Sequence, residues 1–330
     1  MNTRRLRTAI AASAVLALGL SACGGGSNKD EGTSTTKAEF NAANGKVFNP
    51  SDKKGGIIKI ADESAPDSTD PGDTYYGNMW DFVRTYTRTL TMFKDEPGSA
   101  SNELVGDLAE GLGTASDGAK TWTYKLRKGV KFEDGTEVHA QDVKYGITRS
   151  IDKEILPDGP TYFDDMLNWP AGYKGAFKSK GVDPKSAIET PDDYTIVFHL
   201  KKAFAGFDYV LMTPQGAPVP EKADKGAKYK EHVVSSGPYK FTSYQDGKSF
   251  QLRRNENWDP ATDPNRKALA DGYDVTLNVD AEDIDNRLIS GDVDIAFAGT
   301  GVTTATQSRV LSDPALKARA DNPTLSRTWY

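Results

Sequence analysis

A strand–turn–helix pattern in the middle of the chain is the sequence feature that most restricts its fold. Large apolar and aromatic side chains alternate with polar ones along residues 121–127, which predicts a strand with one buried face. Residues 134–135, Asp-Gly, supply turn chemistry after it. From His139 onward, apolar side chains recur at helical spacing, as at Val143 and Ile147. The pattern therefore predicts a fold that mixes strands and helices.

Other segments extend this mixed pattern along the chain. Strands are predicted at 57–60, 194–200, 241–244, 250–254 and 292–297. Helices are predicted at 77–90 and between Asp280, as the capping residue, and Gly291, where the helix ends. Residues 150–191 are predicted to form loops, because repeated prolines interrupt any long helix. We therefore expect an α/β (mixed α+β) fold, with a mixed sheet and flanking helices.

Composition and charge narrow the class of protein. The chain has 330 residues, of which 37% are hydrophobic and 27% charged, so it is globular and long enough for more than one core. The net charge is -6, and residues 1–22 contain three arginines and no acids, so the remainder carries -6 - 3 = -9. An acidic body is a poor partner for phosphate backbones, so nucleic-acid binding is not expected.

The first 22 residues have the order of a secretory signal segment: basic residues, an apolar run at 9–20, then small residues. Leu20-Ser21-Ala22-Cys23 resembles the bacterial lipobox, which implies cleavage before Cys23 and lipid attachment to its thiol. Several acyl chains anchor a protein firmly. The alternatives are an ordinary signal peptide or a buried core thiol. Residues 24–54 are polar and Gly-rich, so with Cys23 they are predicted to form a flexible tether, 23–54.

An ordered string of short segments runs through the middle of the chain: Asp107-Leu108-Ala109-Glu110, Asp117-Gly118, Thr121-Trp122-Thr123-Tyr124, Leu126-Arg127, Gly129-Val130-Lys131-Phe132, Asp134-Gly135-Thr136 and Asp142-Val143. This string resembles the family 5 extracellular solute-binding proteins, which serve ABC importers of oligopeptides, dipeptides and nickel. Later segments also resemble family landmarks: Ser235-Ser236-Gly237-Pro238-Tyr239, Arg254-Asn255-Glu256-Asn257-Trp258 and Asp292-Val293-Asp294-Ile295-Ala296.

This resemblance implies a clamshell of the type II periplasmic-binding-protein kind, which closes around its ligand. Residues 55–330 would form the first lobe, with an inserted subdomain at about 89–190. Family members continue through a second lobe, whereas this sequence ends at Tyr330 inside a predicted strand. We interpret it as a fragment or truncated product, with the second lobe largely missing.

Motifs for catalysis or metal binding are absent from the sequence. It has no phosphate-binding loop, no Gly-x-Ser-x-Gly and no His-Glu-x-x-His, and its only histidines, His139, His199 and His232, are dispersed. We therefore predict no enzyme activity, no cofactor and no metal.

Ligand-binding candidates follow from aromatic composition and from the resemblance. Polar-tipped aromatic side chains suit a cleft, which favours Tyr75, Tyr76 and Trp80, although for Trp80 a core position is slightly favoured over the cleft. Weaker candidates are Thr213, Gly299 and Trp329, which lie where the resemblance places the cleft wall or the crossing between lobes.

The leading hypothesis is a lipid-anchored, extracytoplasmic receptor subunit of an ABC importer. Its expected partners are an oligopeptide or other small solute, the permease subunits, and the membrane through Cys23; a monomer is expected. The alternatives are a surface lipoprotein hydrolase and a truncated, non-functional remnant.

Overall fold

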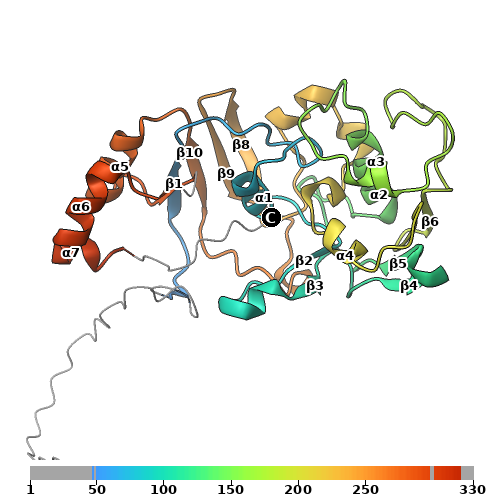
Figure 1. The fold of residues 1–330 in the computed structure, drawn as a ribbon, viewed down its shortest axis with the longest axis horizontal. Helices are drawn as coiled ribbons and strands as arrows, with labels where there is room; N and C mark the ends of the chain where they lie inside the picture. Colours follow the sequence, from blue (N-terminus) through green and yellow to red (C-terminus); the bar gives the residue numbers. More distant parts are fainter. Residues whose placement is uncertain (1–46, 48–49, 298–300, 321–330) are drawn as a thin grey trace, which may run out of the picture. The chain divides into compact units, whose positions relative to one another are not determined.

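The computed structural model describes residues 47, 50–297 and 301–320 (Figure 1). Strands and helices are interspersed along this part of the chain. The predicted mixed α/β fold class is therefore confirmed.

A five-stranded mixed sheet contains the first predicted strand. β1 (Ile57–Ala61) pairs in parallel with β10 (Gly272–Thr276) and β11 (Ile295–Ala296). β9 (Ser249–Arg254) runs antiparallel to β10 and forms a hairpin with β8 (Tyr239–Gln245). The strand order is β11-β1-β10-β9-β8. The three parallel strands thus end at the same edge of the sheet.

Helix α1 (Gly77–Val83) packs on this sheet through aromatic contacts. Phe82 is buried, and its ring centroid lies 5.8 Å from that of Phe250 and 5.4 Å from that of Tyr273. Edge-to-face and tilted aromatic pairs of this kind add to the energy of burial. The contacts fix α1 and the loop before it relative to the strands.

Helix α5 (Ala281–Ser290) begins and ends as the sequence predicts. The Asp280 carboxylate accepts hydrogen bonds from two backbone N–H groups of the first turn, at 3.0 and 3.2 Å. Gly291 has φ 86°, a left-handed conformation that ends the helix. Ile284 is 3% exposed and faces inward.

A second, four-stranded antiparallel sheet contains the alternating strand from the middle of the chain. In sheet order its strands are β4 (Thr114–Ser116), β5 (Thr121–Lys125), β7 (Thr195–His199) and β6 (Ile188–Asp192). The alternation is confirmed, since Trp122 and Tyr124 are buried while Lys125 is exposed. Helix α2 (Ala140–Ser150) packs its fully buried Val143 and Ile147 into the same core.

The remaining strands and α-helices of the described chain are short. They are β2 (Thr91–Phe93) paired with β3 (Leu104–Gly106), and the helices α3 (Tyr162–Met166), α4 (Phe207–Val210), α6 (Thr304–Ser312) and α7 (Pro314–Lys317). None of the helices in this part of the chain combines the length and apolar character needed to cross a bilayer.

The helix predicted at 77–90 is wrong in its second half, because α1 ends at Val83. The backbone N–H of Arg88 donates to the Ser236 hydroxyl at 3.1 Å, a partner far away in the sequence. The Arg88 side chain is fully buried against Asp107. These distant contacts take the place of the helical backbone hydrogen bonds that the local periodicity predicts.

The segment 150–191, predicted to be loop-rich, also contains the short helix α3 and the start of a strand, since β6 begins at Ile188. Pro191 lies within this strand, which a proline tolerates because β6 is at the edge of its sheet. The inserted subdomain at 89–190 stays a prediction; the buried core of the second sheet includes residues from Leu90 to Leu211.

Candidate ligand-binding site

The loops that follow parallel strands are where an open α/β sheet binds ligands. β1 ends at Ala61, and the long loop 62–76 follows it before α1. Beside it, β11 ends at Ala296, and the next N–H, of Phe297, donates to the Ala61 carbonyl at 2.9 Å. The loop 62–76 therefore starts at the edge of the sheet where a ligand is expected.

Two adjacent tyrosines lie exposed at the end of this loop. Tyr75 is 51% exposed and Tyr76 is 52% exposed. Their backbone N–H groups both donate to one carboxylate oxygen of Asp67, which also accepts the Thr74 hydroxyl at 2.7 Å on its other oxygen. The carboxylate fixes the backbone, so the two rings are held out toward solvent.

Tyr162, which begins α3, joins this aromatic surface although sequence reasoning missed it. Its hydroxyl lies 3.3 Å from that of Tyr75, and its side chain is 36% exposed. The contact spans 87 positions of the chain, and no local pattern distinguishes Tyr162 from other loop tyrosines. We call Tyr75, Tyr76 and Tyr162 the tyrosine surface.

Trp80 lies behind the tyrosine surface rather than on it. It is 4% exposed, its indole N–H donates to the Thr74 carbonyl at 2.8 Å, and its ring meets Tyr75 edge-on at 5.7 Å. This placement fits the alternative that Trp80 is a core side chain. Its role as a ligand contact stays a prediction.

The other sequence candidates are not brought to the tyrosine surface by any described contact. Thr213 is 4% exposed, and its hydroxyl donates to the Val210 carbonyl at 2.7 Å. Gly299, Trp329 and the lipid-anchor candidate Cys23 lie outside the described residues.

Two buried acids lie within the loop 62–76. Burial raises the pKa of Asp62, at the end of β1, although the N–H of Ser64 counteracts it. Burial also raises the pKa of Asp73 to about 6, against the opposing effect of the Asp158 N–H, which donates to it at 2.9 Å. Protonation of Asp73 thus occurs at mildly acidic pH.

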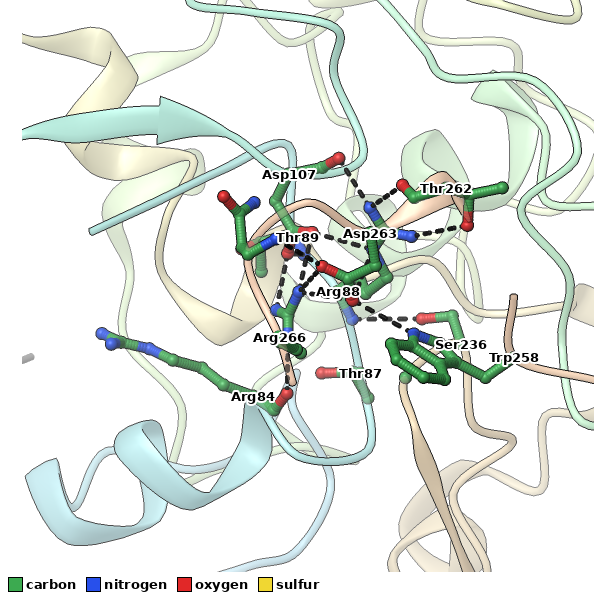
Figure 2. A network of polar contacts seen from close by, with 12 residues as sticks. Arg84, Thr87, Arg88, Thr89, Asp107, Ser236, Trp258, Thr262, Asp263 and Arg266 are labelled. Carbon is green, nitrogen blue, oxygen red and sulfur yellow. Dashed lines mark hydrogen bonds and ion pairs between the residues drawn. The ribbon is translucent and has the colours of Figure 1, made fainter. Parts of the chain in front are cut away.

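Several residues that carry the family resemblance lie in a buried polar network (Figure 2). Asp107 accepts hydrogen bonds from Arg88 at 2.8 Å and from Arg266 at 2.9 and 2.7 Å. The Trp258 indole donates to Asp263, which also pairs with Arg266. Since these groups satisfy one another, they stabilise the fold and are unavailable to a ligand.

The protonation of Asp107 follows from this network. Burial by itself raises its pKa, but the guanidinium groups of Arg266 and Arg88 outweigh burial and lower the pKa to about 2. Asp107 is therefore ionised in the folded protein at neutral pH.

Histidines and acids do not assemble a metal site in the described part of the chain, where no group of three or more potential ligands converges. His199 contacts Glu189 at 2.6 Å, and His232 contacts Glu133 at 2.5 Å. His199 and Glu189 lie on the neighbouring strands β7 and β6, and His232 and Glu133 lie in loops.

Comparison with known proteins agrees with this architecture. The curated relatives include the probable D,D-dipeptide-binding periplasmic protein DdpA of Escherichia coli, 29% identical over 73% of this chain and 43% of that protein. The periplasmic oligopeptide-binding protein OppA of Escherichia coli is 29% identical over 60% of this chain and 36% of that protein. The chain thus spans less than half the length of these relatives.

Solved structures share the fold. The clavulanic acid biosynthesis oligopeptide binding protein 2 superposes with a TM-score of 0.82 at 39% identity, covering 86% of this chain and 51% of that chain. The Escherichia coli murein tripeptide binding protein MppA superposes with a TM-score of 0.63 at 18% identity, over 80% of this chain and 49% of that chain. The predicted type II periplasmic-binding-protein fold is therefore confirmed. Residues 103–330 match the family described as bacterial extracellular solute-binding proteins, family 5 middle, and the chain belongs to that family.

Proposed function

We propose that this protein captures peptides outside the cytoplasm for an ABC importer, and that the tyrosine surface forms part of its ligand site. The observation that carries the proposal is the exposure of Tyr75 and Tyr76 at the end of the loop that follows β1, a strand of the parallel part of the sheet. Rigid, polar-tipped aromatic rings bind varied ligands at low entropic cost.

The relatives support peptides as the ligand class. OppA is named for oligopeptides and DdpA for D,D-dipeptides, and the solved relative at 39% identity is named for oligopeptides. Family members bind substrates rather than convert them, so we propose a non-enzymatic role for this chain. Its partners would be the peptide and the permease subunits of the importer.

The proposal also includes a lipid anchor at Cys23, after removal of residues 1–22. The support is the order of basic, apolar and small residues before the sole cysteine. Replacing Cys23 by serine should release the protein from the membrane fraction and abolish incorporation of labelled palmitate. Continued membrane retention of the variant would contradict the anchor.

Titration of the purified protein with a peptide library tests the ligand class. We expect saturable binding without turnover. Peptide hydrolysis would instead indicate a hydrolase, and the absence of any binding would indicate a remnant without receptor function.

Substitution of Tyr76 tests the location of the site. Tyr76→Ala should weaken peptide binding by about tenfold, the loss of roughly 1.4 kcal/mol that one aromatic contact supplies. Tyr209→Ala is the matched control. Tyr209 is 53% exposed, about as much as Tyr76, but its ring packs against Phe93. Unchanged affinity in the Tyr76 variant would remove this residue from the site.

A further inference from the structure

A buried guanidinium in the last turn of α2 is shared by two carboxylates from different loops. Arg149 donates to both oxygens of Asp70, at 2.8 and 2.9 Å, and to both oxygens of Asp224, at 2.9 and 3.0 Å. The side chains are 0%, 1% and 2% exposed. Two forked ion pairs on one guanidinium fix all three groups in orientation as well as position.

Aromatic side chains close this cluster off from water. The Arg149 guanidinium lies 4.8 Å from the ring centroid of Tyr229 and 5.8 Å from that of Phe177. The Tyr145 hydroxyl donates to Asp224 at 2.9 Å. Because the cluster is excluded from solvent, salt screens its ion pairs little.

Asp70 connects this cluster to the loop that presents the tyrosine surface. Its Oδ1 accepts the N–H of Gly72 at 2.9 Å, and its carbonyl accepts the N–H of Asp73 at 3.0 Å. Tyr75 follows only five positions after Asp70. A Cβ on Gly72 would lie 3.1 Å from Arg149 Nη1, so a glycine here lets the guanidinium approach the loop closely.

Ser150, the next residue of α2 after Arg149, is linked through Gln215 to the segment that carries Tyr162. The Gln215 side-chain amide donates to the Pro160 carbonyl at 2.6 Å and to the Ser150 hydroxyl at 3.3 Å. Pro160 lies two positions before Tyr162. The end of α2 is therefore tied to both segments that carry the tyrosine surface.

We propose that Arg149 is a positioning residue for ligand capture, which acts through Asp70 to hold Tyr75 and Tyr76 in place without touching the ligand. A loop held in its binding conformation spends less of the binding energy on ordering. The effect on affinity rests on the proposed function, whereas the effect on the loop does not.

Two matched substitutions separate positioning from general stability. Asp70→Asn and Asp224→Asn each place an amide against the same buried guanidinium and leave the other forked pair intact, but only Asp70 belongs to the loop 62–76. In Asp70→Asn we expect the backbone amides of Tyr75 and Tyr76 to exchange hydrogen about tenfold faster and peptide affinity to fall about tenfold. In Asp224→Asn both quantities should stay within about twofold of wild type.

Equal changes in the two variants, or no change in Asp70→Asn, would overturn the proposal. If Asp70→Asn does not fold, Gly72→Ala displaces the guanidinium without removing a charge and should reproduce the same pattern. If the wild-type protein binds no peptide, the proposed function fails, and amide exchange at Tyr75 and Tyr76 still decides whether Arg149 positions the loop.

Discussion

At the residue scale, the candidate site consists of exposed aromatic rings whose backbone N–H groups are hydrogen-bonded. Tyr75 and Tyr76 are about half exposed, yet Asp67 binds both of their N–H groups. Trp80 supports Tyr75 from behind. An exposed aromatic group held this firmly is suited to contact a ligand rather than to fill a core.

Asp73 gives a prediction at this scale. Burial raises its folded-state pKa to about 6 from 3.8, so the folded protein binds more protons than the unfolded chain between these values, and stability decreases as the pH rises through this window. Asp73→Asn should therefore raise the free energy of unfolding at pH 7 by roughly 1–3 kcal/mol and have little effect at pH 4. Urea denaturation at both pH values measures this.

The control for this prediction is Asp193→Asn, because Asp193 is exposed and its removal should leave stability within about 0.5 kcal/mol. A loss of stability in Asp73→Asn at pH 7 would show that the ionised carboxylate is stabilising, contrary to this account.

Single residues were predictable from sequence where local composition determines their environment. The adjacent tyrosines Tyr75 and Tyr76 are polar-tipped aromatic residues that were predicted to line a cleft, and both are about half exposed; their contact with a ligand stays a prediction. Tyr162 was not, because its place beside Tyr75 depends on how two distant loops pack. Asp70 and Arg149 were missed for the same reason, since they are 79 positions apart.

At the element scale, α2 organises the site. Its buried side packs on the four-stranded sheet, and its last turn holds the loop 62–76 through Arg149. Gly146 lets a third segment approach, because a Cβ there would lie 2.1 Å from the Ala217 carbonyl oxygen. Small size at this position is therefore a packing requirement.

Gly146→Ala should destabilise the protein, although alanine is normally the better helix former by about 1 kcal/mol. The added methyl group would push α2 away from Ala217, at a cost of about 1–3 kcal/mol. Gln141→Ala, at an exposed position of the same helix, should change the free energy of unfolding by less than about 0.5 kcal/mol. Increased stability in Gly146→Ala would contradict the tight contact.

Elements were predictable from sequence when one face was buried along their whole length. The alternation at 121–127 and the helical spacing after His139 appear in the structure as β5 and α2. The helix at 77–90 was overextended, because Arg88 leaves the helical path to reach Ser236 and Asp107. Sequence periodicity does not reveal buried ion pairs with distant partners.

At the scale of the whole molecule, the buried network around Asp107 joins segments that are far apart in the chain. Asp107 binds Arg88, 19 positions away, and Arg266, 159 positions away. Asp107 carries part of the family resemblance, so the resemblance at this position reports a shared fold rather than a shared ligand.

Asp107→Asn should lower the free energy of unfolding by about 3–5 kcal/mol, because it leaves the buried positive charges of Arg88 and Arg266 with less negative charge to balance them. The pKa of Asp107 is depressed to about 2, so its stabilisation is present above the unfolded pKa of 3.8 and is lost as the pH falls from about 4 to 2. In the wild type, stability should therefore decrease over this range, and the variant should show a smaller decrease. Equal acid sensitivity in both proteins would contradict this role.

Photo-crosslinking of a bound peptide shows whether the tyrosine surface contacts the ligand. A peptide library carrying a photoreactive group would be irradiated with the protein, and the attachment points identified by mass spectrometry. We expect cross-links at Tyr75, Tyr76 and Tyr162 that unlabelled peptide competes away. Competable cross-links confined to other surfaces, with none at these tyrosines, would contradict the proposed ligand site.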